Sequence, residues 1–395
     1  MVVRAEALRS HWVAIALTAM LSGCTGDDWK PAFDEVASPD RFENVAIADA
    51  DDALTFARVD DDGRSRLIAV TAYRDGIVRG IDLSIALGRP LGDPLQAYEA
   101  LGYDGLRAAL AAAPDAARAE IPAGRLTMPL DLGAHHIAAG TNFPEHAGEA
   151  GVEDGPFLFA KLVSPTGPYA RVAAGEALLD YEVEVAWVTL APLAPGKAPA
   201  AMGLILGNDF TDRATLLRHI DPWNVASGDG FTTGKSFPGY LPVGNLFVIP
   251  RDHRRFGAAL ELRLYVNGTL RQRAGAQEMI WDIDELVSQT WAAAERRWAH
   301  RDTQVSLLGD AAVIPPRTLL LSGTPHGTIF AGVHTRHYVG GLTAWLLGGW
   351  DQPLSSRVIS AYIDDARRAG AFLRPGDRVE IHVDRLGVLR NAIIL

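Results

Sequence analysis

The chain has 395 residues, of which 48% are hydrophobic and 22% charged, so it has enough apolar residues to bury the core of an ordinary globular protein. Its formal net charge is −11 and it has no basic stripe, which argues against nucleic-acid binding. Cys24 is the only cysteine, which excludes a disulfide framework within the chain.

The first residues have the pattern of an export signal. Arginines precede the apolar run 13–21 (VAIALTAML), which is too short to span a bilayer as a permanent helix. The segment LSGC that ends at Cys24 resembles a bacterial lipobox, in which the cysteine carries the lipid. We therefore predict a lipoprotein signal peptide at 1–23, a polar tether at 24–30 and a periplasmic protein anchored to a bacterial membrane. The alternatives are a plain signal peptide with a chance cysteine, or a wrongly extended start and a cytoplasmic protein.

Residues 31–130 are predicted to form a small N-terminal α/β domain, with a boundary near the IPAG segment at 121–124. Alternating apolar residues and the turn signal DDDG at 60–63 indicate a β-hairpin, and alanine-rich residues at helical spacing follow it. The expected elements are strands at 53–59, 66–73 and 76–83, and a helix within 93–119 that breaks at Gly102 and Pro114.

Residues 131–395 are rich in predicted strands that glycine and proline punctuate, which is typical of a mainly β domain. Apolar residues at helical spacing predict helices at 278–300 and 355–368. The predicted fold class is α+β, mainly β.

The segment 179–187 (LDYEVEVAW) places two glutamates on one face of a predicted strand. Glu182 and Glu184 lie roughly 7 Å apart along that strand. If the face is exposed, the pair is simply solvated, which is the usual meaning of this pattern. If the face is interior, the carboxylates need a cation, and Mg²⁺ binds carboxylate oxygens in this manner. The opposite face carries Tyr181, Val183, Val185 and Trp187.

An acidic segment follows the next predicted strand, at 202–207. Asp209 lies where this strand meets a turn, a position suited to a third metal ligand. Asp212 precedes a predicted helix at 213–219, and either aspartate could cap it. We expect Asp212 to be the cap and Asp209 the ligand.

Two further segments carry residues with catalytic chemistry. Lys235 lies in a glycine-rich loop, where a lysine is normally solvated, but beside a metal it could pair with a substrate carboxylate or an oxyanion. If Pro144 begins a helical turn, His146 and Glu149 share a face, and a carboxylate that orients an imidazole is suited to deprotonate water. An H-x-x-E pattern alone usually has no function.

Eight segments, in this order, resemble the fumarylacetoacetate hydrolase family. The resemblance begins near residue 140 and continues to the C-terminus, and the leading domain fits the family's small N-terminal domain less specifically. The family has a catalytic domain of the mixed β-roll or pseudo-barrel type, which we expect here. The segments are TNFPEHAGEAG (141–151), FLFAKL (157–162), DYEVEVAWV (180–188), GNDFTDR (207–213), GKSFPGYLPVG (234–244), LRLYVNGTLRQ (262–272), LLSGTPHG (320–327) and RPGDRVEIHVDRLGVLRN (374–391).

The resemblance implies a role for each matching residue. Glu182, Glu184 and Asp209 match metal-binding carboxylates, which implies Mg²⁺ or else Mn²⁺ or Ca²⁺ as cofactor. A second group matches the rest of the family's site, and the family also implies a homodimer. In that group His146 and Glu149 activate water, Lys235 is the active-site lysine, and Arg213 and Thr324 contact the substrate.

The chain departs from the family in two places. Ala214 and Leu216 stand where the family commonly has an acidic residue and a glutamine, which changes how a substrate carboxylate or ketone would be held. An insertion at about 331–371 replaces a short link. The insertion would either cover the site, with Trp345 and Trp350 lining the site, or form a peripheral docking element. Long inserted segments are found in both roles.

The resemblance implies a divalent-metal-dependent hydrolase that cleaves a C–C bond in a small 1,3-dicarbonyl or acylpyruvate-like 2-oxo acid through a stabilised enolate. Decarboxylases, hydratases and isomerases on this scaffold share that enolate and remain alternatives. A further alternative from another class is a non-catalytic lipoprotein that binds a small acid.

Overall fold

The computed structural model confirms the predicted fold class, α+β and mainly β. The chain forms two compact units, and most of it belongs to the larger one. Cys24, the predicted signal peptide and the tether lie outside the described residues. The described residues are 33, 35–61, 63–150 and 155–330 in the larger unit, with 372–395, and 332–371 in the smaller unit.

A sheet of eleven strands is the largest element of the larger unit. Its strands pair antiparallel, except for a parallel pair of β18 and β6, and β5 (Leu126–Thr127) lies beside β1. Along its path the strands are β4 (Arg118–Pro122), β3 (Ile77–Asp82), β2 (Arg64–Arg74), β1 (Ala53–Asp61), β13 (Val243–Pro250), β11 (Met202–Asn208), β10 (Val183–Thr189), β18 (Leu319–Leu321), β6 (His136–Gly140) and β7 (Phe157–Lys161).

A second sheet of five strands contributes to the main core. Its strands are β15 (Thr269–Gly275), β14 (Glu261–Val266), β19 (Arg378–Val383), β20 (Gly387–Ile394) and β8 (Arg171–Ala173). Alternate side chains of β10, including Val183 and Val185, share one apolar cluster with residues of β14 and β19. The predicted apolar face of residues 181–187 is confirmed, because Tyr181 and Trp187 belong to the same cluster.

Helices cover the other side of the large sheet, so side chains on both faces of β10 are buried. The second apolar cluster contains Ala186 of β10, Leu106 of α3 and Leu216 of α5. The helices of the larger unit are α2 (Leu83–Ala86), α3 (Pro94–Ala111), α4 (Pro144–Ala150), α5 (Arg213–His219), α6 (Phe231–Lys235), α7 (His253–Ala258) and α8 (Ile283–Ala292). Two short strand pairs complete the unit, β9 (Leu179–Asp180) with β12 (Thr211–Asp212), and β16 (Trp298–His300) with β17 (Thr303–Val305).

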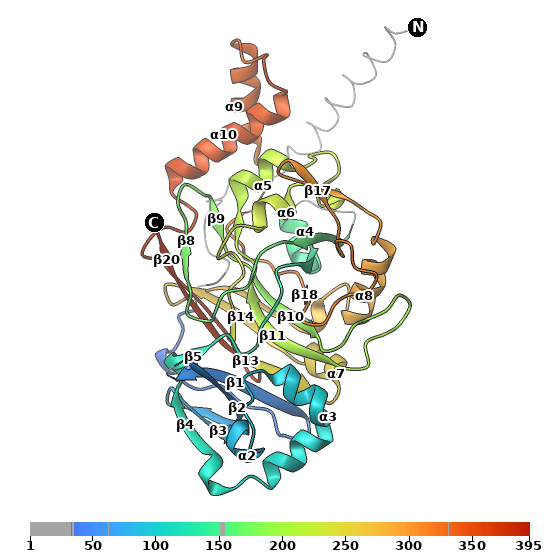
Figure 1. Ribbon diagram of the computed structural model, residues 1–395. Helices are drawn as coiled ribbons and strands as arrows, with labels where there is room; N and C mark the ends of the chain where they lie inside the picture. The colour runs from blue at the N-terminus through green and yellow to red at the C-terminus, as the bar shows by residue number, and fades with distance from the viewer. Residues whose placement is uncertain (1–32, 34, 62, 151–154, 331) are drawn as a thin grey trace. The chain divides into compact units, whose positions relative to one another are not determined.

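The leading region has the predicted hairpin, third strand and helix, and its strands continue the large sheet (Figure 1). Strand β1 pairs with β13 antiparallel, with Phe56 opposite Phe247. No break between compact units falls near residue 130, since residues 31–330 belong to one unit. Helix α3 kinks at Gly102, where φ is 63°, as its glycine predicted.

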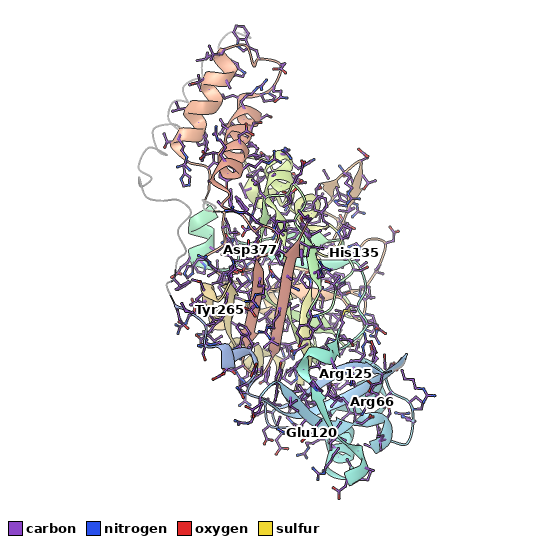
Figure 2. The ribbon with its side chains drawn as sticks, turned by 90° about the vertical axis from the view of Figure 1, so that its left-hand side faces the viewer. Arg66, Glu120, Arg125, His135, Tyr265 and Asp377 are labelled. Atoms are coloured by element: carbon purple, nitrogen blue, oxygen red, sulfur yellow. The ribbon has the colours of Figure 1, made fainter. Side chains whose placement is uncertain are left out.

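Paired charges hold the outer strands of the leading region together. Arg66 and Arg125, both labelled in Figure 2, bind the carboxylate of Asp61, and Arg66 also donates to Asp82 at 2.8 Å. Arg79 of β3 pairs with Glu120 of β4 at 2.7 Å across the sheet edge. These pairs are partly exposed, so each contributes little to the free energy of unfolding.

The prediction of one long helix at 278–300 is wrong, because the observed helix is shorter. Helix α8 begins after Asp282, whose carboxylate accepts from the N–H of Glu285 at 2.9 Å, and it ends at Ala292. The chain then forms β16, where Trp298 is buried and donates from Nε1 to the carbonyl of Ser227 at 2.9 Å. Burial of this large side chain outweighs the local helical spacing.

The smaller unit is a helical hairpin of α9 (Thr335–Leu346) and α10 (Leu354–Ala369), and the helix predicted at 355–368 is confirmed. Gly341 of α9 lies so close to Val358 that a Cβ atom would come within 2.6 Å of its backbone. His337 packs edge-on against Tyr362 at 5.1 Å between ring centroids. None of the helices in the described part of the chain has the length and apolar character that a bilayer-spanning helix requires.

Candidate active site

Strands β10 and β11 bring three carboxylates together. Their register places Glu184 opposite Gly207, and the N–H of Asp209 donates to the carbonyl of Glu182 at 2.9 Å. One carboxylate oxygen from each of Glu182, Glu184 and Asp209 lies within 4.8 Å of the others. Their exposed fractions are 5%, 0% and 0%, so the alternative of a solvated glutamate pair is excluded.

Buried cations surround these carboxylates. The ammonium of Lys235 lies 2.5 Å from Glu182 Oε2 and 3.0 Å from Asp209 Oδ2. Arg213 donates from Nη2 to Glu182 Oε1 at 2.6 Å and from Nε to Asp180 Oδ2 at 2.8 Å. Because each group is 5% exposed or less, these pairs interact in a medium that screens charge weakly.

The two glutamates have opposite pKa shifts. Burial raises the pKa of Glu184 well above its usual range, and the charges of Asp209 and Glu182 raise it further. Burial would also raise the pKa of Glu182, but Lys235 and Arg213 outweigh it and lower that pKa to about 2. Unlike shifts in neighbouring acids are typical of functional sites.

The donor set fits a hard divalent cation. Glu184 Oε2 accepts from the N–H of Gly323 at 2.8 Å, whereas the buried Oε1 atom has no hydrogen-bond partner. Asp209 Oδ2 faces the lysine ammonium but makes no hydrogen bond of good geometry. Buried carboxylate oxygens without partners are costly, and coordination of a cation such as Mg²⁺ would satisfy them.

His146 lies near Glu182, with which it interacts electrostatically. It sits in α4, which begins at Pro144 as predicted, and it is 7% exposed. Glu149 belongs to the same short helix, but its side chain lies outside the described residues.

Thr324 is held by the two sheets. Its hydroxyl donates to the carbonyl of Val183 at 3.0 Å and accepts from Gln272 Nε2 at 2.8 Å. Gln272 also accepts, at Oε1, from the N–H of Val183 at 2.9 Å, so this amide joins β15 to β10. The adjacent turn therefore fixes the N–H of Gly323 against Glu184.

Helices α5 and α6 place the arginine and the lysine. Asp212 caps α5 as predicted, accepting from the N–H of Ala214 at 3.0 Å, which sets Arg213 at the first helical position. A Cβ atom at Gly234 would lie 2.6 Å from the Cβ of Leu216. Only glycine lets the two helices approach this closely, and Lys235 follows directly.

Comparison with known proteins identifies the family. Residues 135–394 match the family model described as fumarylacetoacetate (FAA) hydrolase, C-terminal. The chain belongs to the fumarylacetoacetate hydrolase family. It is 23% identical over 263 residues to the mitochondrial oxaloacetate tautomerase Fahd2a of Rattus norvegicus, which covers 65% of this chain and 66% of that relative. The chain thus matches about two thirds of this relative's length.

Solved structures of the fumarylacetoacetate hydrolase fold resemble this one. Maleylpyruvate hydrolase from Sphingobium sp. SYK-6 superposes with a TM-score of 0.53 at 18% identity, over 86% of this chain and 99% of that chain. The 2-hydroxyhepta-2,4-diene-1,7-dioate isomerase from Mycobacterium marinum superposes with a TM-score of 0.50 at 19% identity, over 86% and 98%. At these identities the likeness shows the fold alone.

The structure adds one lysine that the sequence reading left without a role. Lys161, at the end of β7, is fully buried and its ammonium binds Asp209 and the carbonyls of Lys235 and Tyr240, the last at 3.0 Å. Burial is the main cause that lowers its pKa. The sequence offered one indication that this lysine is buried, because it ends an apolar predicted strand (FLFAK).

Asp180 is a second residue of the site that the sequence reading left without a role. Its carboxylate accepts from Arg213 and from the N–H groups of Ile329 and Phe330, at 2.9 Å and 3.2 Å. The guanidinium of Arg213 also lies over the ring of Phe330, 5.4 Å from its centroid. Asp180 therefore orients the arginine and ties the segment before the insertion to the site.

Proposed function

We propose that this chain is a divalent-metal-dependent hydrolase that cleaves a C–C bond in a small acylpyruvate-like 2-oxo acid. The observation that supports this most is the buried group of Glu182, Glu184 and Asp209, in which Glu184 Oε1 has no partner in the described structure. Membership of the fumarylacetoacetate hydrolase family is the second support. The three carboxylates would hold the cation, Mg²⁺ in the first instance.

A bound divalent cation would supply Lewis-acid polarisation of neighbouring substrate oxygens. The protein's own side chains would stabilise the negative charge of the substrate. Lys235 and Arg213 hold fixed positive charge where the substrate carboxylate and the developing enolate bring negative charge. The low exposure of both side chains keeps water from screening that charge.

His146 would remove a proton from a water molecule whose oxygen bonds to the distal carbonyl carbon. The C–C bond then breaks and its electron pair remains on the 2-oxo acid fragment as an enolate. That fragment takes up a proton at carbon. One water is consumed, and the products are a carboxylic acid and a shorter 2-oxo acid.

Proton transfer without hydrolysis is the second candidate. An isomerase or tautomerase would form the same enolate and return the proton to another atom. Two similar proteins are named as an oxaloacetate tautomerase and a 2-hydroxyhepta-2,4-diene-1,7-dioate isomerase, and these names support proton transfer as a second candidate function. Decarboxylation and hydration share the enolate, and a binding lipoprotein without turnover is the candidate outside enzyme function.

The test follows the loss of enol absorbance from a panel of acylpyruvates and oxaloacetate, using metal-stripped protein with and without Mg²⁺ or Mn²⁺. Metal-dependent loss that yields a carboxylic acid is the expected result. Loss without C–C cleavage would assign a tautomerase or isomerase. Tight binding of the acids without turnover would assign a binding protein and overturn the enzyme proposal.

Two variants make this assay specific. Glu184→Gln keeps the size of the side chain but removes a metal-binding charge, and activity should fall at least about a hundredfold. Glu120→Gln changes a glutamate that is 68% exposed in the leading region and should retain full activity. Equal activity in the two variants at saturating metal would contradict the assignment of Glu184.

Export and lipidation of Cys24, a periplasmic location and a homodimer are also proposals. The lipobox-like LSGC segment supports the first two, and the family resemblance supports the third. Palmitate labelling of the wild type but not of Cys24→Ser, in the bacterial host, tests the anchor. Equal labelling of both would contradict it. Sedimentation equilibrium of the purified protein tests the dimer.

A further inference from the structure

Helix α9 of the insertion has an apolar face directed outward. Val339, Leu342 and Leu346 recur at intervals of three and four residues, which places them on one face of the helix. Their exposed fractions are 60%, 38% and 58%. Leu347 and Trp350, 83% and 69% exposed, extend this surface past the end of the helix. We call these five residues the α9 apolar face.

These side chains are not needed for the core of the hairpin. The opposite face of α9 packs on α10, where Gly341 meets Val358 and His337 meets Tyr362. At 100° per residue, position 341 lies far around the helix from position 346. The hairpin has therefore buried one face of α9 and left a second apolar face open.

An open face of a helix on a soluble protein normally carries charged residues. Arg336 is the only Asp, Glu, Lys or Arg in the α9 sequence TRHYVGGLTAWL, and every residue of that helix is described. Contiguous exposed apolar side chains of this kind mark a surface that binds a partner. The two tryptophans Trp345 and Trp350 contact each other, 6.1 Å between ring centroids, and stiffen the end of this surface.

Arginines of the insertion indicate the partner, and Arg336 precedes Val339 by three residues on α9, so it flanks the α9 apolar face. A groove of about 460 Å³ between α9 and α10 is lined by Arg336, Arg357 and Arg368, against Asp364 and Asp365. The insertion as a whole has four arginines and three aspartates, a net charge of +1, in a chain of net charge −11. Leucine and tryptophan beside arginine is the chemistry that binds an anionic phospholipid surface.

We propose that the insertion 332–371 is a membrane-docking element that places the α9 apolar face in the headgroup region of an anionic phospholipid bilayer. Arg336 and Arg368, which pair with Asp365 in the hairpin, contact the lipid phosphates, and Trp350 with Leu346 and Leu347 enters the boundary of the acyl chains. The proposal does not depend on the lipid at Cys24 or on the enzymatic function.

Vesicle sedimentation tests the apolar contact in the full chain carrying Cys24→Ser, so that no lipid anchor contributes. The vesicles are phosphatidylcholine with and without phosphatidylglycerol. Addition of Leu346→Asp and Trp350→Asp should weaken partition into phosphatidylglycerol vesicles at least about tenfold. The matched control is Trp223→Asp, since Trp223 is 80% exposed in the larger unit, and it should change nothing. Equal binding by parent and double variant overturns the proposal.

A second pair of variants tests the charge. Arg368 is 75% exposed and pairs with Asp365 three residues before it, and Arg118 is 74% exposed and pairs with Asp115 in the same spacing. Arg368→Gln should weaken binding to the anionic vesicles about fivefold and leave binding to neutral vesicles unchanged. Arg118→Gln should affect neither. Equal losses in both variants would show a general charge effect and contradict a specific contact.

Size-exclusion chromatography without vesicles separates lipid from a second copy of the chain. If the Asp variants elute as the parent does and lose vesicle binding, the face binds lipid. If they turn a dimer into a monomer while vesicle binding is kept, the face joins two copies and the proposal is wrong. Far-UV circular dichroism and the enol assay should match the parent, because both side chains are exposed.

Discussion

The ammonium of Lys235 lies 2.5 Å from Glu182 Oε2 and 3.0 Å from Asp209 Oδ2, so one buried cation bridges two of the three candidate metal ligands. Burial opposes its charge, but Asp209 and Glu182 outweigh burial and raise the pKa of Lys235 above its usual range. The lysine is therefore a fixed charge at neutral pH and is better suited to hold an anion than to act as a base.

Replacement of this lysine should affect chemistry strongly. Lys235→Met keeps the length of the side chain but removes the charge that would face the developing enolate, so kcat/KM should fall about 10²- to 10³-fold at saturating metal. Lys197→Met is the matched control, since Lys197 is exposed, and its kcat/KM should equal that of the wild type. A loss below threefold in Lys235→Met would remove this lysine from the mechanism.

Lys161 should matter first for stability. Its ammonium is fully buried between Asp209 and two carbonyls, so Lys161→Met removes one of the two ammonium groups beside Asp209 and leaves both buried carbonyls without this donor. We expect the free energy of unfolding to fall by about 3–5 kcal/mol in urea, with an unchanged m value. Lys197→Met again serves as control. Unfolding midpoints that agree within error for both variants would show that the buried pair contributes nothing net.

The pH dependence of stability should report His136. Burial is the main cause that lowers the pKa of this fully buried histidine to about 3, from about 6.5 when unfolded. Between these values the unfolded state binds more protons, so stability is complete above about pH 6.5 and falls by about 1.4 kcal/mol per pH unit below it.

The variant His136→Asn isolates this contribution. The Nδ1 atom of His136 accepts from the N–H of Leu319 at 3.1 Å, and an asparagine oxygen can take its place. Urea unfolding at pH 7 and pH 5 should show a loss for the wild type that exceeds the loss for His136→Asn by about 2 kcal/mol. His219→Asn, at an exposed histidine, should behave as the wild type does. Identical slopes in all three proteins would contradict the assignment.

Metal addition should stabilise the folded protein. Binding to the folded state alone raises the free energy of unfolding by about 2.7 kcal/mol at a hundredfold excess over Kd, which a thermal melt detects as a higher Tm. Addition of a chelator should reverse the rise. Glu184→Gln should abolish it, and Glu120→Gln should keep it. A rise of equal size in Glu184→Gln would place the cation elsewhere.

Gly234→Ala should separate α6 from α5. The added methyl group would lie 2.6 Å from Leu216 Cβ, so the helices must shift at a cost of about 1–3 kcal/mol. Because Lys235 comes next, kcat should fall along with stability. The control is Gly124→Ala, where nothing lies within 4 Å of the added atom and stability should be unchanged. A Gly234→Ala protein with wild-type kcat would show that the helix spacing does not position the lysine.

Local patterns predicted the parts of the site that depend on local geometry. The alternation at 179–187 placed Glu182 and Glu184 on one face, and the carboxylate of Asp212 capped α5 as expected. Whether that face was interior could not be predicted, because it depends on helices that pack there from distant parts of the chain. Family resemblance, not periodicity, supported the interior choice.

Other features depended on long-range packing and were missed. Lys161 reads as an ordinary strand-ending lysine, and only the fold brings it to Asp209, 48 residues later. The end of α8 was missed because helical spacing continues past Ala292, while burial of Trp298 draws the chain into β16. Both features depend on contacts between residues far apart in the sequence, and local patterns do not report such contacts.

The pairing of β1 with β13 has a consequence for anyone who trims this protein. The region that matches the family model starts at residue 135, yet β13 receives backbone hydrogen bonds from β1, which precedes that start. A fragment that begins there would expose β13 as a long apolar edge strand, next to the strand that leads to Asp209. Such an edge recruits other chains. The leading region thus protects this edge of the sheet, and expression of the family-matching residues alone should yield aggregate instead of a smaller folded protein.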